Sequence, residues 1–250
     1  MAGHSKWASI KHKKKITDAR RGAQFTKLAR AIQVAAREGG GDPAGNPALS
    51  LAIQKAKDAA MPKDNIERAI AKGTGADKDA EAFESVVYEG YGPGGVAVLV
   101  EALTDNRNRT GSEVRHVFTR HGGNLGEPGS VAWVFEKKGV VVVDAGKGSE
   151  DDLMVAIDAG AEDVSLDENV YEVVTEPADL TAVRDALEGA GIEIDSAELT
   201  QRPTTRVEVD DAQVATLMRL LEALDEHDDV QTVNANFEAD AAAMERAAAA

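Results

Sequence analysis

The stretch ESVVYEGYGPGGVAVLVEAL, residues 84–103, marks the point where the apolar pattern of the chain changes from a helical to a strand period. Upstream of it, apolar residues recur at three- and four-residue spacing, which is typical of helices with one buried face. Within it, two apolar runs flank the turn sequence GPGG, and this arrangement predicts a β-hairpin. The glycines resemble a phosphate-binding loop only superficially, because no Lys-Ser or Lys-Thr pair follows and the next element is a strand.

Three short helices are expected before the hairpin. The first covers residues 18–37 and ends at the glycines that follow. Asn46 before Pro47 is typical of an N-cap followed by a proline at the first helical position, so a second helix begins there. Pro62 opens a third helix, which ends at Gly73. These helices predict a helical N-terminal domain.

The region after the hairpin predicts two α/β units. Residues 135–202 alternate in the order strand, helix, strand, strand, helix, strand, which is the ferredoxin-like β-α-β-β-α-β order. The later strand segments TTRVEV and VQTVNANF lack partners of their own, so we expect them to pair with the segment 84–121. The expected fold class is α+β multidomain: an N-terminal three-helix domain followed by two α/β domains, one of them a ferredoxin-like unit inserted into the other. The expected boundaries are a basic arm at 1–17, the helical domain at 18–80, a discontinuous α/β domain at 81–134 plus 203–238, the ferredoxin-like domain at 135–202, and a frayed tail at 239–250.

Composition narrows the class of protein. The 250 residues are enough for two or three domains of roughly 100–150 residues each. The absence of cysteine excludes disulfides, thiolate zinc sites and cysteine nucleophiles. No run of about 18 apolar residues is present, and the basic N-terminus lacks the apolar segment of a secretory signal. We therefore expect a cytoplasmic monomer with no membrane contact.

Charge is divided unevenly along the chain. Residues 1–75 carry 15 Lys and Arg against 6 Asp and Glu, a net charge of +9. The remaining 175 residues carry 13 against 38, a net charge of −25, and the whole chain has −16. Such asymmetry is typical of a basic module that binds a polyanion, while the acidic remainder repels nucleic acid elsewhere.

The cations of the arm and of the first helix are the predicted nucleic-acid contacts. Lysines neutralise phosphates whatever the base sequence, and the indole of Trp7 offers a face on which a base can stack. The alternative is a solvated basic tail, but the cations of the first helix continue the same surface. The predicted contacts are Lys6, Trp7, Lys11, His12, Lys13, Lys14, Lys15, Arg20, Arg21, Lys27, Arg30 and Arg37.

A second anion contact is expected at Arg107 and Arg109. They lie just before a helix that Thr110 opens with a capping-box pattern, and helix N-termini favour anions through free N–H groups and the helix dipole. The alternative is a polar turn in which Asp105 and Asn106 cap locally. The sequence leaves both interpretations open.

Enzymatic chemistry has little support in the sequence. No histidines show a tight ligand pair such as H-x-x-x-H, so no metal site is expected. Carboxylates are numerous but show no paired arrangement for acid–base work. We expect no catalytic residue, no cofactor and no small-molecule substrate. A metal-dependent nuclease is the remote alternative, since the basic region holds only scattered acids.

Five longer motifs carry a family resemblance: MAGHSKWASIKHKK, RRGAQFTKL, MPKDNIERAI, YEGYGPGGVAVLVEALTDNRNRT and HGGNLGEPGSVAWVF. They resemble the bacterial YebC/PmpR proteins, described as probable transcriptional regulators, and also the mitochondrial translational activator of cytochrome c oxidase. The resemblance covers most of residues 1–240. It implies one helical and two α/β domains, no enzymatic activity and no required cofactor.

The expected function is therefore non-enzymatic regulation of gene expression through nucleic-acid binding. One form is a DNA-binding transcriptional regulator that grips phosphates with its basic N-terminal domain. The alternative is a ribosome-associated translation activator that binds ribosomal or other structured RNA. No recognition helix of the helix-turn-helix type is evident, which weighs against sequence-specific reading of DNA.

Overall fold

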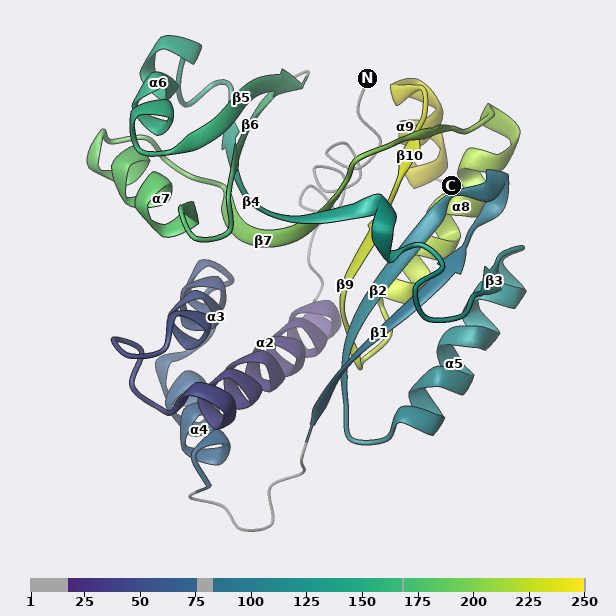
Figure 1. The fold of residues 1–250 in the computed structure, drawn as a ribbon, viewed down its shortest axis with the longest axis horizontal. Helices are drawn as coiled ribbons and strands as arrows, with labels where there is room; N and C mark the ends of the chain where they lie inside the picture. Colours follow the sequence, from purple (N-terminus) through teal and green to yellow (C-terminus); the bar gives the residue numbers. More distant parts are fainter. Residues whose placement is uncertain (1–17, 76–82, 168, 250) are drawn as a thin grey trace.

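The computed structural model describes residues 18–75, 83–167 and 169–249 and has a mixed α+β architecture (Figure 1). Helices form the N-terminal part, and two antiparallel four-stranded sheets with their own helices form the rest. The expected α+β class is confirmed. No helix of the described residues is long and apolar enough to cross a membrane.

The N-terminal part consists of α2 (Asp18–Gly39), α3 (Pro47–Asp58) and α4 (Lys63–Gly73) around a small apolar core. The predicted cap is confirmed: the Asn46 side chain accepts from the Leu49 N–H at 3.1 Å and donates to the Ala35 carbonyl at 2.8 Å. Helices α2 and α4 approach closely at Gly73, where a Cβ atom would lie 2.3 Å from the Gln33 carbonyl oxygen. A larger residue at Gly73 would therefore separate the two helices.

The predicted hairpin is β1 (Glu84–Tyr91) paired antiparallel with β2 (Ala97–Thr104). The 3₁₀ turn η1 (Pro93–Gly95) joins them, and Gly94 has φ +77°, a left-handed conformation that glycine adopts without strain. The sheet is completed by β9 (Val230–Ala235) beside β2 and by the short β3 (Asn124–Leu125) beside β1, in the order β3-β1-β2-β9.

Of the two segments expected to pair with the hairpin, TTRVEV and VQTVNANF, only the second does so. β9 pairs with β2 over most of its length. The other segment forms only β8 (Val207–Glu208), which pairs parallel with β10 (Phe237–Glu238) rather than with the hairpin.

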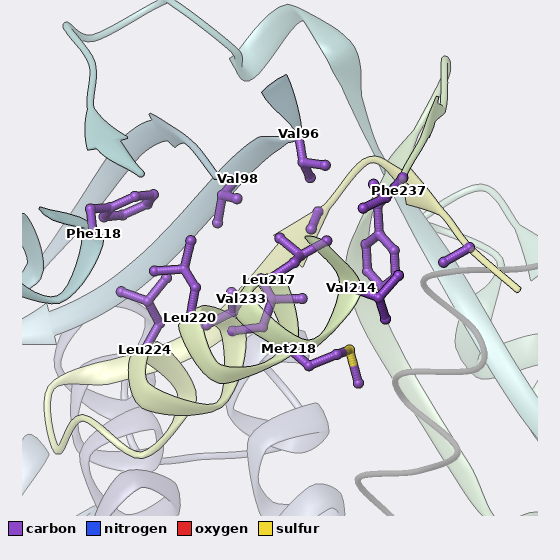
Figure 2. Packing of buried hydrophobic residues seen from close by; sticks show 14 of the residues in the cluster. Val96, Val98, Phe118, Val214, Leu217, Met218, Leu220, Leu224, Val233 and Phe237 are labelled. Atoms are coloured by element: carbon purple, nitrogen blue, oxygen red, sulfur yellow. The ribbon is translucent and has the colours of Figure 1, made fainter. Parts of the chain in front are cut away.

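Helices α5 (Arg107–Arg120) and α8 (Asp211–Asp225) bury the apolar face of this sheet. Figure 2 shows the labelled leucines of α8 beside Val98 and Phe118 in one cluster. The expected frayed tail is wrong for most of its length, because α9 (Ala241–Ala249) packs against α8. Met244 of α9 is 1% exposed, so the burial of apolar surface holds this helix in place.

The remaining elements run in the order strand, helix, strand, strand, helix, strand: β4 (Phe135–Asp144), α6 (Glu150–Asp158), β5 (Ala161–Asp167), β6 (Val170–Thr175), α7 (Leu180–Gly189) and β7 (Ser196–Pro203). The sheet order is β5-β6-β4-β7, all neighbours are antiparallel, and the two helices share a core with the sheet. The last strand begins at Ser196, after Ile192 has turned into the core behind the preceding helix.

Candidate nucleic-acid interface

Half of the predicted nucleic-acid contacts precede the described part of the chain. The backbone of α2 includes Arg20 and Arg21, and Arg21 is exposed and already has an interaction partner. The predicted contacts that lie outside the described residues are Lys6, Trp7, Lys11, His12, Lys13, Lys14 and Lys15. Their role in binding stays a prediction.

The cations farther along α2 lie against the body of the protein. The Lys27 ammonium donates to the Asp225 carbonyl, and the Arg30 guanidinium donates to the Asp228 carbonyl at 2.7 Å. We expected these cations to continue the exposed surface of the arm. Instead, their hydrogen-bond partners place them between α2 and the end of α8 with the turn before β9. Figure 1 shows the arrangement of these elements.

Phe83, the residue before β1, is held by the same helix. Arg37 donates to the Phe83 carbonyl, and the guanidinium carbon of Arg30 lies 5.0 Å from the centre of the Phe83 ring. A guanidinium at this distance from an aromatic face is attracted by the ring electrons. Lys27 therefore joins α2 to α8, and Arg30 and Arg37 join α2 to the residues that precede β9 and β1, whatever their part in binding nucleic acid.

Asp229 is the centre of this contact, which we call the Asp229 junction. One of its carboxylate oxygens accepts from Arg30 at 2.8 Å, and the other accepts from Arg109 at 2.9 Å and from Thr110 at 2.6 Å. The Asp229 side chain is 3% exposed, whereas Arg30 is 19% and Arg109 43% exposed. A buried carboxylate is therefore satisfied by two cations that come from α2 and α5.

The protonation of Asp229 follows from these partners. Burial alone would raise the pKa of its carboxyl group, but the hydrogen bonds from Thr110 and Arg109 and the charges of Arg30 and Arg109 outweigh burial, so the pKa lies below its ordinary value. The same contacts with Asp229 and Asp105 raise the pKa of Arg109. Asp229 stays ionised at neutral pH.

The start of α5 differs from the prediction. The helix begins at Arg107, and its N-cap is Asn106, whose side chain accepts from the Arg109 N–H at 3.1 Å. The capping-box interpretation with Thr110 is wrong, because its hydroxyl instead bonds to Asp229 and lies 2.7 Å from the Thr104 hydroxyl. Both arginines thus lie inside the first helical turn, not before it.

The structure therefore separates the two predicted anion ligands. The Arg109 guanidinium bonds to two carboxylates, those of Asp105 at 2.7 Å and of Asp229 at 2.9 Å. Arg107 is 64% exposed, and its nearest acid is Glu84 at 3.9 Å. Only Arg107 retains a largely open guanidinium. The anion contact itself stays a prediction.

One group of potential metal ligands lies beside the junction. Side-chain atoms of Glu113, His227 and Asp229 lie within 4.8 Å of one another. The ring of His227 accepts from the Asp229 N–H through Nδ1 at 3.1 Å, so Nε2 carries the proton and donates to Glu113 at 2.9 Å. Since both ring nitrogens and both Asp229 oxygens have protein partners, hydrogen bonding accounts for this group without an ion.

Other cations of the helical part were not singled out in the sequence. Lys55 of α3 pairs with Glu198 of β7 at 2.5 Å, which joins α3 to the second sheet. In contrast, Lys57, Arg68 and Lys72 are exposed and have no acidic partner within 4.0 Å among the described residues. Their surface positions add positive charge to the helical part of the chain.

Comparison with known families accounts for almost the whole chain. Residues 5–76 match the family model described as the TACO1/YebC protein N-terminal domain, and residues 83–237 match the model described as the TACO1/YebC second and third domain. The chain belongs to the TACO1/YebC family.

Relatives of this TACO1/YebC protein are similar over nearly their full length. A protein of Rubrobacter xylanophilus described as a probable transcriptional regulatory protein is 58% identical over 239 residues, covering 95% of this chain and 96% of the relative. One of Persephonella marina with the same description is 58% identical over 249 residues, covering 98% and 99%. A crystal structure described as a conserved hypothetical protein from Aquifex aeolicus is 53% identical, has a TM-score of 0.85 and covers 94% of this chain and 97% of that one.

The motif HGGNLGEPGSVAWVF of this TACO1/YebC chain forms a loop that Glu89 holds in place. The carboxylate of Glu89 accepts from the backbone N–H groups of Gly129 at 2.6 Å, Val131 at 2.7 Å and Ala132 at 2.7 Å. Burial would raise the pKa of Glu89, but these three hydrogen bonds lower it below its usual range. The loop ends in the 3₁₀ turn η2 (Ala132–Val134), where Trp133 is 73% exposed. No pattern along the sequence marks Glu89 as a functional residue, because its partners are backbone groups 40 or more residues away.

Proposed function

We propose that this protein is a non-enzymatic, nucleic-acid-binding regulator of gene expression. In the first form of the proposal it is a DNA-binding transcriptional regulator that holds phosphates with its basic N-terminal region. The names of its relatives, probable transcriptional regulatory proteins, support a regulatory role.

The observation that carries the proposal is the division of charge. A net charge of +9 in residues 1–75 beside −25 in the rest restricts attraction for a polyanion to one end of the chain. Within the described residues, Lys57, Arg68 and Lys72 are exposed and without an acidic partner, so they are available to phosphates beside the arm.

The second candidate is an RNA-binding translation factor that works on the ribosome. The contacts of α2 favour it over a groove-reading DNA binder, because a helix whose cations are bonded to α8 and Phe83 offers few of them to a DNA groove. An arm of lysines with one indole suits structured RNA as well as duplex DNA.

Affinity measurements at several salt concentrations test the role of the arm. Replacing Lys11, Lys13, Lys14 and Lys15 with glutamine should weaken binding to duplex DNA or structured RNA and lower the log–log salt slope by up to about 3 to 4. The matched control removes the same charge from the acidic remainder of the chain by replacing four exposed cations there, Arg120, Lys137, Arg206 and Arg219, with glutamine. Unchanged affinity and slope in the arm variant would disprove the phosphate grip.

A pull-down of the full chain with nuclease treatment separates the two forms. Retention on DNA that is lost on DNase treatment supports the transcriptional regulator. Co-purification with ribosomal RNA that resists DNase and is lost with RNase supports the translation factor. Incubation with single- and double-stranded substrates and Mg²⁺ or Mn²⁺ tests the non-enzymatic assignment, which cleavage surviving repurification would contradict.

A further inference from the structure

Strand β1 has an edge that is open along most of its length. On the side away from β2, β3 pairs only with Gly90 and Tyr91 of β1. Among the described residues, no strand pairs with residues 84–89 on this side. An uncovered edge of this length presents unpaired backbone donors and acceptors to any extended chain that reaches it.

The register of the hairpin shows which backbone groups face outward. The Gly92 N–H donates to the Val96 carbonyl at 2.8 Å. In an antiparallel pair every second residue bonds to the same neighbour, so Gly90, Tyr88 and Val86 bond to β2. Ser85, Val87 and Glu89 therefore direct their N–H and C=O groups away from β2. This orientation is confirmed at Glu89, whose carbonyl accepts from the Gly126 N–H at 2.8 Å on the side away from β2. The backbone groups of Ser85 and Val87 remain for another strand.

A groove of about 480 Å³ follows this edge. Residues 86–89 of β1 form one wall, the N-terminal half of α5 forms the second, and residues 125–128 close one end. Val87 is 47% exposed in it. At Gly111 of α5 a Cβ atom would lie 3.4 Å from the Tyr88 ring, an ordinary van der Waals contact, so α5 and β1 lie close together at the base of the groove.

The α5 wall of the groove is positively charged. Arg107 is 64% exposed, and Arg115 is exposed and has no acidic partner within 4.0 Å among the described residues. Of the two carboxylates in the lining, Glu89 is bound by three amides on the opposite side, and Glu127 lies at the closed end. The open part of the groove therefore favours an anionic occupant.

The spacing of the two arginines matches a strand. They are eight residues apart on α5, or about 12 Å at a rise of about 1.5 Å per residue. Side chains four residues apart on an added strand point to the same side and are about 13 Å apart. α5 and β1 run in the same direction, since the Tyr88 hydroxyl bonds to the Arg107 carbonyl and Gly90 lies beside Phe118 farther along α5.

We propose that this groove binds an extended acidic segment of a partner protein, which adds to the hairpin sheet as a strand beside β1. The open backbone groups of Ser85 and Val87 supply the ladder, and Arg107 and Arg115 select acidic residues four positions apart. A nucleic-acid phosphate would use the arginines but leave the backbone edge unpaired. The two kinds of ligand therefore differ in their need for the Val87 N–H.

The test uses the full chain and a fluorescein-labelled peptide, Thr-Glu-Val-Thr-Val-Glu-Val-Thr, followed by fluorescence anisotropy. Val87→Pro removes an outward N–H without breaking a bond to β2, and Val87→Thr is the matched control that keeps this N–H. Arg115→Ala is compared with Arg120→Ala, which removes an exposed charge from the last turn of the same helix. A peptide N-methylated at alternate residues tests the ladder independently of the fold of any variant.

Saturable binding of the acidic peptide to the parent protein supports the proposal, provided that Val87→Pro and N-methylation each weaken its affinity about tenfold. The Val87→Thr and Arg120→Ala variants should bind the peptide with nearly the affinity of the parent. Arg115→Ala should weaken it severalfold, and a lysine-for-glutamate peptide should not bind. Absence of binding by the acidic peptide overturns the proposal. Binding of the peptide that survives both Val87→Pro and N-methylation also overturns it. The proposal fails as well if the peptide does not bind but a single-stranded RNA does, with an affinity that falls in Arg115→Ala.

Discussion

Replacing Asp229 with asparagine tests whether the Asp229 junction joins α2 to the hairpin sheet. Asparagine keeps the shape of the side chain but removes its charge and one acceptor. Its carbonyl oxygen can accept either from Arg30 or from Arg109 and Thr110, but not from both sides. Its NH₂ group then faces the remaining donors, which lose their acceptor.

The expected loss of stability follows from the exposure of the partners. Each charge-assisted hydrogen bond contributes about 1.5–3 kcal/mol, and breaking a fully buried pair costs about 3–5 kcal/mol. Asp229 is buried, but Arg109 is 43% and Arg30 19% exposed, so water compensates in part. We expect Asp229→Asn to lower the free energy of unfolding by about 2–4 kcal/mol.

Urea unfolding measures the loss of stability, and amide hydrogen exchange shows which elements lose protection. The Leu103 N–H, which bonds to the Asp229 carbonyl at 2.8 Å, and the amides of α2 should exchange faster in the variant. The control is Asp105→Asn, which removes a carboxylate that is 29% exposed and bonds to Arg109. Asp105→Asn should lower the free energy of unfolding by less than about 1 kcal/mol. A loss for Asp229→Asn no larger than that of the control would refute the account of the junction.

The pH dependence gives an independent check. The folded pKa of Asp229 lies below that of the unfolded chain, so its stabilising contribution is fully present above about pH 4. It is lost as the pH falls through the folded pKa. The stability difference between the parent and Asp229→Asn should therefore shrink in acid below about pH 4 and be constant at neutral pH.

Four further substitutions have definite expected outcomes. Arg109→Ala should lower the free energy of unfolding because it leaves the buried Asp229 short of a donor, whereas Arg107→Ala should leave it nearly unchanged; equal effects in urea unfolding would contradict this. Glu89→Gln should cost about 1.5–3 kcal/mol and speed exchange of the loop amides it binds, and a neutral result would show that the loop holds itself. Met244→Ala should cost about 2–5 kcal/mol, and loss of α9 without any change in melting temperature would refute its place in the core.

Features that depend on neighbours in sequence were predictable. The cap at Asn46 needs only the N–H of Leu49, three residues away, and the hairpin needs only its turn and two flanking runs. The α+β class and the division of charge follow from periodicity and composition in the same way. Such signals are local, so the chain carries them whatever the rest of the fold does.

Features that depend on distant partners were not predictable. Arg30 and Asp229 are 199 residues apart, and no pattern along the chain distinguishes an arginine that bonds to a buried carboxylate from one that faces solvent. The start of α5 was misplaced for the same reason, since Asp229, distant in sequence, bonds to the Thr110 hydroxyl that was expected to cap the helix. The Ala-rich tail is a helix because its apolar side meets α8. The sequence by itself determined the first helices, the hairpin and where positive charge gathers. Only the tertiary structure decided which of those charges bond to the protein, because pairing and burial depend on distances in space.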